Sequence, residues 1–201
     1  MLRPTAWPLA VALTLLAGGA ASGAPPLFDD VTSKVGLQGV ESGRVSFADL
    51  DDDGYPDAII DKTRIFMNVP AEAKAAGGRR FVPHPHTPRV IPADVRQPSC
   101  VQVGDVNDDG HPDLFYGRNT NLSKKRFEDD GLRNEIWLND GEGGFERVED
   151  AGVGAHPTST ISACFVDYDR DGLLDLFVGN AYVAYGKSLE AHPDRLYRGR
   201  G

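Results

Sequence analysis

The stretch Phe47-Ala-Asp-Leu-Asp-Asp-Asp-Gly-Tyr-Pro-Asp-Ala-Ile-Ile60 decides the fold, because its pattern occurs three times in this 201-residue chain. Val103-Gly-Asp-Val-Asn-Asp-Asp-Gly-His-Pro-Asp-Leu-Phe-Tyr116 and Phe165-Val-Asp-Tyr-Asp-Arg-Asp-Gly-Leu-Leu-Asp-Leu-Phe-Val178 align with it without gaps. The shared pattern is D-x-[DN]-x-D-G-x-x-D followed by three apolar residues. The first aspartates are Asp49, Asp105 and Asp167, so the repeats lie 56 and 62 residues apart, and each unit is long enough for several strands.

The repetition continues on both sides of the acidic loop. One apolar segment leads into each loop and another leaves it. Downstream, Arg64-Ile-Phe-Met-Asn68, Asn134-Glu-Ile-Trp-Leu-Asn139 and Asp194-Arg-Leu-Tyr-Arg198 place an aromatic residue at one equivalent position. In the second repeat a Gly-rich turn over residues 140–144 then leads into a further apolar segment, as in a hairpin. Each repeat therefore predicts four short strands.

Four-stranded units that repeat along a chain are typical of a β-propeller, in which each unit forms one blade. We therefore expect an all-β fold with three blades, at about residues 45–96, 97–156 and 157–201, in a domain that spans residues 25–201. A two-sheet sandwich is the alternative, but the strict repetition of the loop and of the aromatic position argues against it. No sustained helical period is present, and residues 71–76 offer only a short helical turn.

The two ends of the domain predict an incomplete ring. Residues 27–36 resemble residues 145–152, so residues 27–32 are expected to form a last strand that completes another blade. Gly201 aligns with Gly141, inside the turn before the fourth strand of the third repeat. Three blades are fewer than the usual number of about four to eight. We expect the native protein to continue with more repeats, and a chain of this length to self-associate.

The first 24 residues predict a cleaved secretory signal peptide. Arg3 precedes an apolar run over residues 9–17, and small residues follow up to Ala24. An uncleaved membrane anchor is the alternative, although the second half of the segment is Ala, Gly and Ser. No cysteine lies near the cleavage zone, which excludes a bacterial lipid-attached form. We expect a secreted, periplasmic or extracellular protein with no membrane span after cleavage.

Composition excludes some functions. The chain has 21 Lys plus Arg against 30 Asp plus Glu, a formal net charge of −9, so phosphate backbones would repel it and a nucleic-acid partner is not expected. Its 40% of hydrophobic residues is ordinary for a globular protein. Two cysteines are too few for a disulfide scaffold or a four-thiolate zinc site.

The acidic loops predict calcium sites. Oxygen side chains at loop positions 1, 3, 5 and 9, together with the backbone carbonyl at position 7, would surround a cation that takes about 6 to 8 oxygen ligands. The glycine at position 6 permits the tight bend. An EF-hand is excluded, because it needs a Glu at position 12 and flanking helices, and here that position is apolar. In the alternative interpretation the aspartates only form turns, which would explain one loop but not three. The candidate metal ligands are Asp49, Asp51, Asp53, Tyr55 and Asp57; Asp105, Asn107, Asp109, His111 and Asp113; and Asp167, Asp169, Asp171, Leu173 and Asp175. By charge, the second site, with Asn107, is expected to be the weakest.

These loops resemble the FG-GAP or VCBS repeats of β-propellers like those of integrin α-subunits. Their pairing with the hairpin over residues 134–148 and the lead-in over residues 28–37 is similar to the secreted cartilage acidic protein type. The resemblance covers residues 28–201 and implies a calcium-binding scaffold that binds or adheres to an extracellular protein or carbohydrate, without catalysis. The chain departs from the pattern at residues 69–80, at an insertion over 120–133, and in lacking the C-terminal domain usual for that type.

An enzyme is the alternative function: the chain would be the propeller part of a secreted hydrolase or lyase whose catalytic residues lie outside this sequence. No nucleophile elbow or zincin motif is present.

Four further features are given little weight. His84 and His86 could start a zinc site but have no evident third ligand. Cys100 and Cys164 are expected to be buried free thiols, with a disulfide as the alternative. The basic run at residues 124–126 is expected to be a solvated turn, and Asn121 begins a glycosylation sequon.

Overall fold

The structure is a computed structural model that describes residues 27–60, 64–72, 76–84, 99–118, 127, 129, 131–142, 144–184 and 190–201. The predicted signal peptide, His86, the basic run 124–126 and Asn121 lie outside these residues. The described residues form β-strands, one short 3₁₀ helix, η1 (Ala76–Gly78), and irregular segments. This confirms the all-β prediction. The part of the chain that the structure describes contains no helix with the length and apolar character needed to cross a bilayer.

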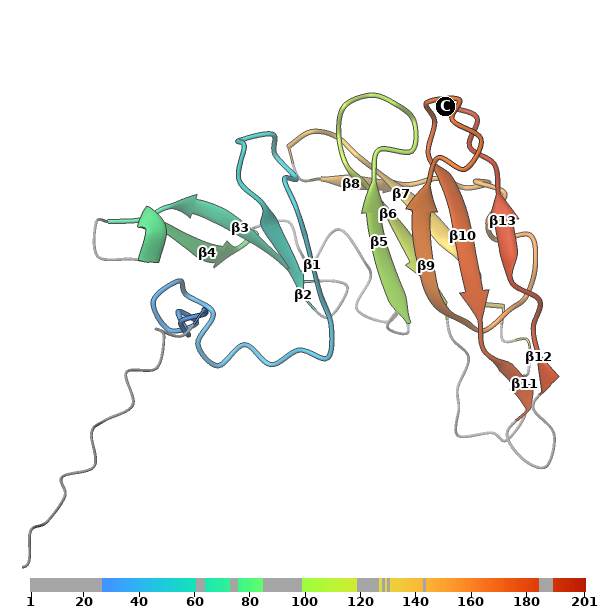
Figure 1. Cartoon of the computed structure of the whole chain (residues 1–201), viewed down its shortest axis with the longest axis horizontal. Helices are drawn as coiled ribbons and strands as arrows, with labels where there is room; N and C mark the ends of the chain where they lie inside the picture. Colours follow the sequence, from blue (N-terminus) through green and yellow to red (C-terminus); the bar gives the residue numbers. More distant parts are fainter. Residues whose placement is uncertain are drawn as a thin grey trace, which may run out of the picture. The chain divides into compact units, whose positions relative to one another are not determined.

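The first two repeats each form one antiparallel sheet of four strands in chain order, as predicted (Figure 1). The first sheet contains β1 (Val45–Ala48), β2 (Asp57–Ile60), β3 (Arg64–Pro70) and β4 (Arg79–Pro83). The second sheet contains β5 (Cys100–Gly104), β6 (Asp113–Gly117), β7 (Glu135–Asn139) and β8 (Phe145–Arg147). Residues 69 and 70 and residues 79 and 80, expected to be part of a connection, extend β3 and β4.

The third repeat forms a sheet of three strands in the order β13-β10-β9. These strands are β9 (Thr160–Val166), β10 (Asp175–Asn180) and β13 (Arg195–Tyr197). A small hairpin, β11 (Tyr182–Ala184) and β12 (Glu190–Ala191), is inserted between β10 and β13. The sequence did not predict this hairpin, because residues 182–191 match no part of the repeated sequence pattern.

Strand register confirms that the three repeats are equivalent. The aromatic residues Phe66, Trp137 and Tyr197 each pair with the residue that follows the last aspartate of the acidic loop, which is Ala58, Leu114 or Leu176 respectively. Because the pairing fixes which side chains share a face, equivalent residues of the three sheets point the same way. In all three sheets, the same positions of the repeat therefore point to the same face.

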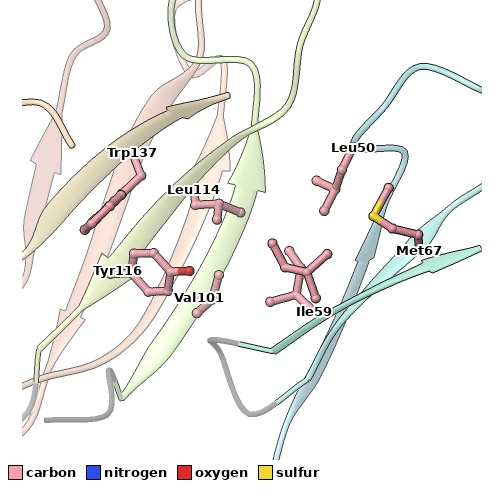
Figure 2. Packing of buried hydrophobic residues seen from close by; sticks show 8 residues of the cluster. Leu50, Ile59, Met67, Val101, Leu114, Tyr116 and Trp137 are labelled. Carbon is pink, nitrogen blue, oxygen red and sulfur yellow. The ribbon is translucent and has the colours of Figure 1, made fainter. Parts of the chain in front are cut away.

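The second sheet has apolar contacts on both faces. A first core cluster combines Leu50, Ile59, Ile65 and Met67 of the first repeat with Val101, Leu114, Tyr116 and Trp137 of the second (Figure 2). A second cluster joins Cys100, Phe115, Ile136 and Val153 of the second repeat to Leu176 and Val178 of the third. Consecutive repeats therefore share a core, as blades of one propeller would, while the number of blades and the closure of a ring stay predictions.

The other face of the first sheet is covered by the segment that precedes β1. Ala58, Ile60 and Phe66 are buried there against Leu37 and Val40. The amide of Phe81 donates to the carbonyl of Val35 over 2.8 Å, which holds this segment on the sheet.

Two expectations about this part of the fold and about the cysteines are wrong. Residues 28–32 are not a strand: the amides of Lys34, Val35 and Leu37 donate to carbonyls of Val31 and Thr32, so the chain turns instead of extending. The preceding Phe28 is 90% exposed.

Both cysteines are free and Cys100 is buried, but Cys164 is exposed, because the face of the third sheet that carries it is uncovered.

Candidate metal centre

The three acidic loops share one backbone conformation. The residue at position 4 is left-handed in each, with φ of 60° at Asp52, 59° at Asp108 and 60° at Arg170. The glycine at position 6 also has a positive φ, which a side chain would strain. Each loop joins the first strand of its sheet to the second. The sequence repeat is therefore also a repeat in three dimensions.

The aspartate at position 1 organises each loop. One oxygen of Asp49 accepts from the amide of Asp53 at 3.1 Å, and the other accepts from Gly54 at 2.8 Å. Asp105 and Asp167 accept from the equivalent amides at 2.8 to 3.1 Å. These bonds close each loop around the first carboxylate, and each oxygen keeps a further lone pair for a cation.

The aspartate at position 9 ties the acidic loop to the sheet. Asp57, Asp113 and Asp175 are at most 1% exposed. In the second loop, the oxygens of Asp113 accept from the amides of Val106 and Asn139 at 2.8 and 2.9 Å. Asp57 and Asp175 have the same two kinds of partner in their own repeats. A cation bound to the position-9 carboxylate would therefore also stabilise the sheet to which this carboxylate is hydrogen-bonded.

Burial and hydrogen bonds move the pKa values of the loop carboxyls in opposite directions. Burial raises the pKa of Asp57 and of Asp113 above the usual value. Hydrogen bonds lower the pKa at position 5: from Arg79 to Asp53, from the His111 amide to Asp109, and from the Leu173 amide to Asp171. The position-5 carboxyls therefore stay ionised to lower pH than the position-9 carboxyls of the first two loops.

Carboxylates converge in two of the loops. Single oxygens of Asp49, Asp51 and Asp57 all lie within 4.8 Å of one another, and so do those of Asp167, Asp169 and Asp175. These residues occupy positions 1, 3 and 9. Hard oxygen donors at this spacing suit calcium, so the residues fit the ion that the pattern implies. The position-5 aspartates are not in these two groups.

The second loop differs at position 3. The amide nitrogen of Asn107 donates to Asp109 over 2.8 Å, and its carbonyl oxygen accepts from the Asp109 amide over 3.3 Å. Asn107 still offers an oxygen, but no charge. The loop keeps the backbone hydrogen bonds of the other two, so it remains a candidate site.

Arginines pair with the first and third loops, which sequence reasoning missed. Arg79 lies 2.6 Å from Asp53 and stacks 3.6 Å from the ring centroid of Tyr55. Arg198 lies 2.9 Å from Asp169 and 2.7 Å from Asp171. Among the described residues, no arginine pairs with a candidate ligand of the second loop. The first and third loops each combine four carboxylates with one arginine, and the second loop has three carboxylates and no arginine. The three loops therefore have the same formal charge, so charge does not make the second site the weakest.

The backbone of each position-7 residue is held in place by a hydrogen bond from its amide. Tyr55, His111 and Leu173 donate these amides to the position-5 carboxylate of their loops at 2.9 to 3.0 Å. Their side chains differ, as expected if only the backbone carbonyl contributes to a site. The prediction that this carbonyl is a ligand is not tested.

The zinc hypothesis gains no support from the described residues. His84 is buried, and its amide donates to the carbonyl of Ile65 over 2.8 Å. It belongs to neither of the groups that could hold a metal.

One comparison with known proteins bears on the family. Residues 105–178 match the FG-GAP-like repeat family. The match runs from the first aspartate of the second loop to Val178 in β10, and thus includes the second and third acidic loops. No curated protein shows a significant match to the chain. This part of the chain is similar to FG-GAP-like repeats, and the similarity suggests a β-propeller type of binding or adhesion module.

Proposed function

We propose that this chain is part of a secreted, calcium-binding β-propeller of the FG-GAP type that acts as a binding or adhesion scaffold without catalysis. The observation that carries the proposal is the threefold recurrence of one loop conformation at one place, between the first two strands of consecutive sheets. The hairpin and lead-in sequences favour the cartilage acidic protein type within this class.

Calcium would stabilise the scaffold through the loops. Positions 1, 3, 5 and 9 would hold the ion with side-chain oxygens, and Tyr55, His111 and Leu173 with their carbonyls. The bound ion would supply positive charge among carboxylates that otherwise repel one another. Because Asp57, Asp113 and Asp175 also accept from a backbone amide in or just after the third strand of their sheets, the loop and the sheet would be stabilised together.

The ligand of the scaffold would be an extracellular protein or carbohydrate. The leader-like residues 1–24 support export, and extracellular calcium modules bind with a Kd of about 10⁻⁴ to 10⁻³ M, as suits a calcium-rich compartment. The net charge of −9 argues against polyanionic ligands.

The test is thermal unfolding with calcium and with a chelator, followed by fluorescence of Trp137, which lies in the first core cluster. At about 10 mM calcium and a Kd of about 1 mM, each site adds about 1.4 kcal/mol. For a domain of this size each site should raise Tm by about 3 to 6 °C.

The matched variants are Asp51→Ala and Asp52→Asn, which each remove one negative charge, from adjacent residues. Asp51 is in a converging group, whereas Asp52 is not. The calcium-dependent rise in Tm should shrink for Asp51→Ala and persist for Asp52→Asn. Equal Tm values with calcium and with chelator in the unmodified chain would refute the proposal.

A further inference from the structure

The side chain of Asn139, the last residue of β7, joins the first acidic loop to the second. Its amide nitrogen donates to the carbonyl of Leu50, at position 2 of the first loop, over 3.1 Å. It also donates to the carbonyl of Pro112, at position 8 of the second loop, over 3.2 Å. The side-chain oxygen accepts from the amide of Gly141 over 3.1 Å. Because the nitrogen carries two hydrogens and its partners are both carbonyls, the three contacts agree on one orientation of the amide group.

The hydrogen bonds continue to the position-9 aspartates of both loops. The backbone amide of Leu50 donates to Asp57 over 3.0 Å, and that of Asn139 donates to Asp113 over 2.9 Å. A path of hydrogen bonds therefore connects the two carboxylates through Leu50 and Asn139. All four residues are at most 4% exposed. Hydrogen bonds that are shielded from water in this way strengthen one another.

Both ends of the path lie among candidate calcium ligands. In the chain, Leu50 lies between Asp49 and Asp51, which belong to one converging group of carboxylates. An ion held by these two carboxylates would fix the carbonyl of Leu50 at the place where Asn139 reaches it. At the other end, Asn139 is bonded to Asp113, a candidate ligand of the second loop. An ion in either loop would therefore order part of what the other loop must order to bind its own ion.

We propose that Asn139 is a positioning residue that couples calcium binding at the first and second loops, so that occupancy of one loop raises the affinity of the other. The inference rests on the calcium binding proposed above. Ordering the Asn139 side chain and the Leu50 carbonyl costs conformational entropy. The first ion to bind orders both groups, and the second ion then binds without that cost. The coupling is reciprocal, because each ion must change the affinity for the other by the same factor.

The sign of the coupling identifies its source. Two bound cations repel each other, so charge alone would lower the affinity of the second loop once the first is occupied. A shared buried hydrogen bond has the opposite effect, and its net contribution corresponds to a factor of about two to ten in an equilibrium constant. An increase in affinity would therefore come from the bonded path and not from charge.

The third repeat provides an internal control. Gly199 occupies the position of Asn139, since its amide donates to Asp175 over 2.8 Å as the amide of Asn139 donates to Asp113. It has no side chain that could reach the second loop. A Cβ added to Gly199 would lie 2.4 Å from the carbonyl oxygen of Leu174, so the close approach of the two backbones leaves no room for one. The third loop should therefore bind calcium independently of the second.

The experiment is an NMR titration of the full chain with calcium. Gly54, Gly110 and Gly172 donate their amides to the position-1 carboxylates, so the amide resonance of each glycine reports on its own loop. Asp51→Ala should disable the first loop, because it removes a carboxylate of the converging group. The calcium concentration at the midpoint for Gly110 should then rise by a factor of about two to ten. The midpoint for Gly172 should stay unchanged.

Two further variants separate coupling from charge. Asp52→Asn removes a negative charge from the same loop without removing a candidate ligand, and it should leave the Gly110 midpoint unchanged. Asn107→Ala removes the position-3 oxygen of the second loop without changing its charge. It should raise the Gly54 midpoint by about the factor that Asp51→Ala produces at Gly110.

A matched pair of asparagine variants tests the link itself. Asn139→Ala removes the bonds to both loops, whereas Asn68→Ala removes only the equivalent bond in the first repeat, from its side chain to the carbonyl of Pro56 over 3.0 Å. In Asn139→Ala, the further change Asp51→Ala should no longer move the Gly110 midpoint. In Asn68→Ala it should still do so. The comparison of the unmodified chain with Asp51→Ala tests the coupling without any change at Asn139, so it decides the sign even where Asn139→Ala does not fold.

Three results would overturn the inference. The first is a Gly110 midpoint that Asp51→Ala leaves unchanged or lowers. The second is a Gly172 midpoint that rises as much as that of Gly110. The third is coupling that persists in folded Asn139→Ala, or that Asn68→Ala abolishes equally. Glycine resonances that titrate independently would leave the proposed calcium binding intact, whereas no response from any of the three would refute that binding together with the inference.

Discussion

The side-chain amide of Asn139 donates a hydrogen bond to the backbone carbonyl of Leu50, 3.1 Å away. Leu50 lies in the first acidic loop, and Asn139 ends β7 of the second sheet. The same amide group also contacts the carbonyl of Pro112 in the second loop, at 3.2 Å. One buried side chain therefore connects two candidate metal loops of consecutive repeats.

Replacing this amide should destabilise the fold. Asn139→Asp removes the donor group, leaves two buried carbonyls unpaired and places a charge where the side chain is 4% exposed. We expect a loss of about 2 to 4 kcal/mol in the free energy of unfolding, measured with urea and Trp137 fluorescence. Glu146→Gln on the exposed side of β8 is the control and should change it by less than about 0.5 kcal/mol. A loss no larger than that of the control would count against the link between repeats.

Removing Arg198 should strengthen calcium binding at the third loop. The arginine pairs with Asp169 and Asp171, and the second repeat has Leu138 at the equivalent position. Because the pair is exposed, Arg198→Leu should tighten binding only by a factor of about two to five. The Gly172 amide resonance reports on this loop during an NMR titration. Arg200→Leu, which removes the same charge nearby, should have a smaller effect, and equal effects would rule out a specific role for Arg198.

Calcium stabilisation should decrease as the pH falls. The raised pKa of Asp57 and of Asp113 lets protons compete with the ion at a higher pH than at ordinary aspartates. In chelator these two groups act in the opposite direction: a folded-state pKa above the unfolded value makes ionisation costly near neutral pH, and this cost is relieved as the pH falls through the folded-state pKa. Both effects reduce the difference in Tm between calcium and chelator. Melting curves from about pH 7 to about pH 4.5 test this, and a difference that grows toward acid pH would contradict it.

A methyl group at Gly117 should disturb the contact between the second and third sheets. A Cβ there would lie 2.5 Å from the sulfur of Cys100 and 2.7 Å from Cγ2 of Thr160. Overpacking of this kind costs about 1 to 3 kcal/mol, so Gly117→Ala should lower the midpoint of urea unfolding. Gly43→Ala is the control, because no atom lies within 4 Å of its added Cβ. An unchanged midpoint for Gly117→Ala would mean that the two sheets are not held this closely.

The repeated features were predictable from sequence. Equal spacing within each loop placed the aspartates, and a shared short motif downstream placed the aromatic residues Phe66, Trp137 and Tyr197. The observed register has these aromatic residues in equivalent pairs. Prediction from the repeats succeeds here because each sheet presents the same faces to its neighbours, which requires similar residues at equivalent positions.

The features that differ between repeats were not predictable. Residues 28–32 resemble a strand in sequence, but a strand also needs a partner, and the carbonyls of Val31 and Thr32 instead accept from amides a few residues downstream. Alternation along β9 placed Cys164 on one face without showing whether that face is covered. Arg79 lies 26 residues from Asp53, and only the fold brings the two together.

The central claim is that the three acidic loops bind calcium in the folded chain, and a calorimetric titration with calcium tests it most directly. The account predicts binding at three sites with a Kd of about 10⁻⁴ to 10⁻³ M, and a loss of one site in Asp51→Ala, which removes the side-chain oxygens, but not in Asp52→Asn. The central claim would be contradicted if the emission of buried Trp137 showed that the chain is folded and the titration with calcium released or absorbed no heat.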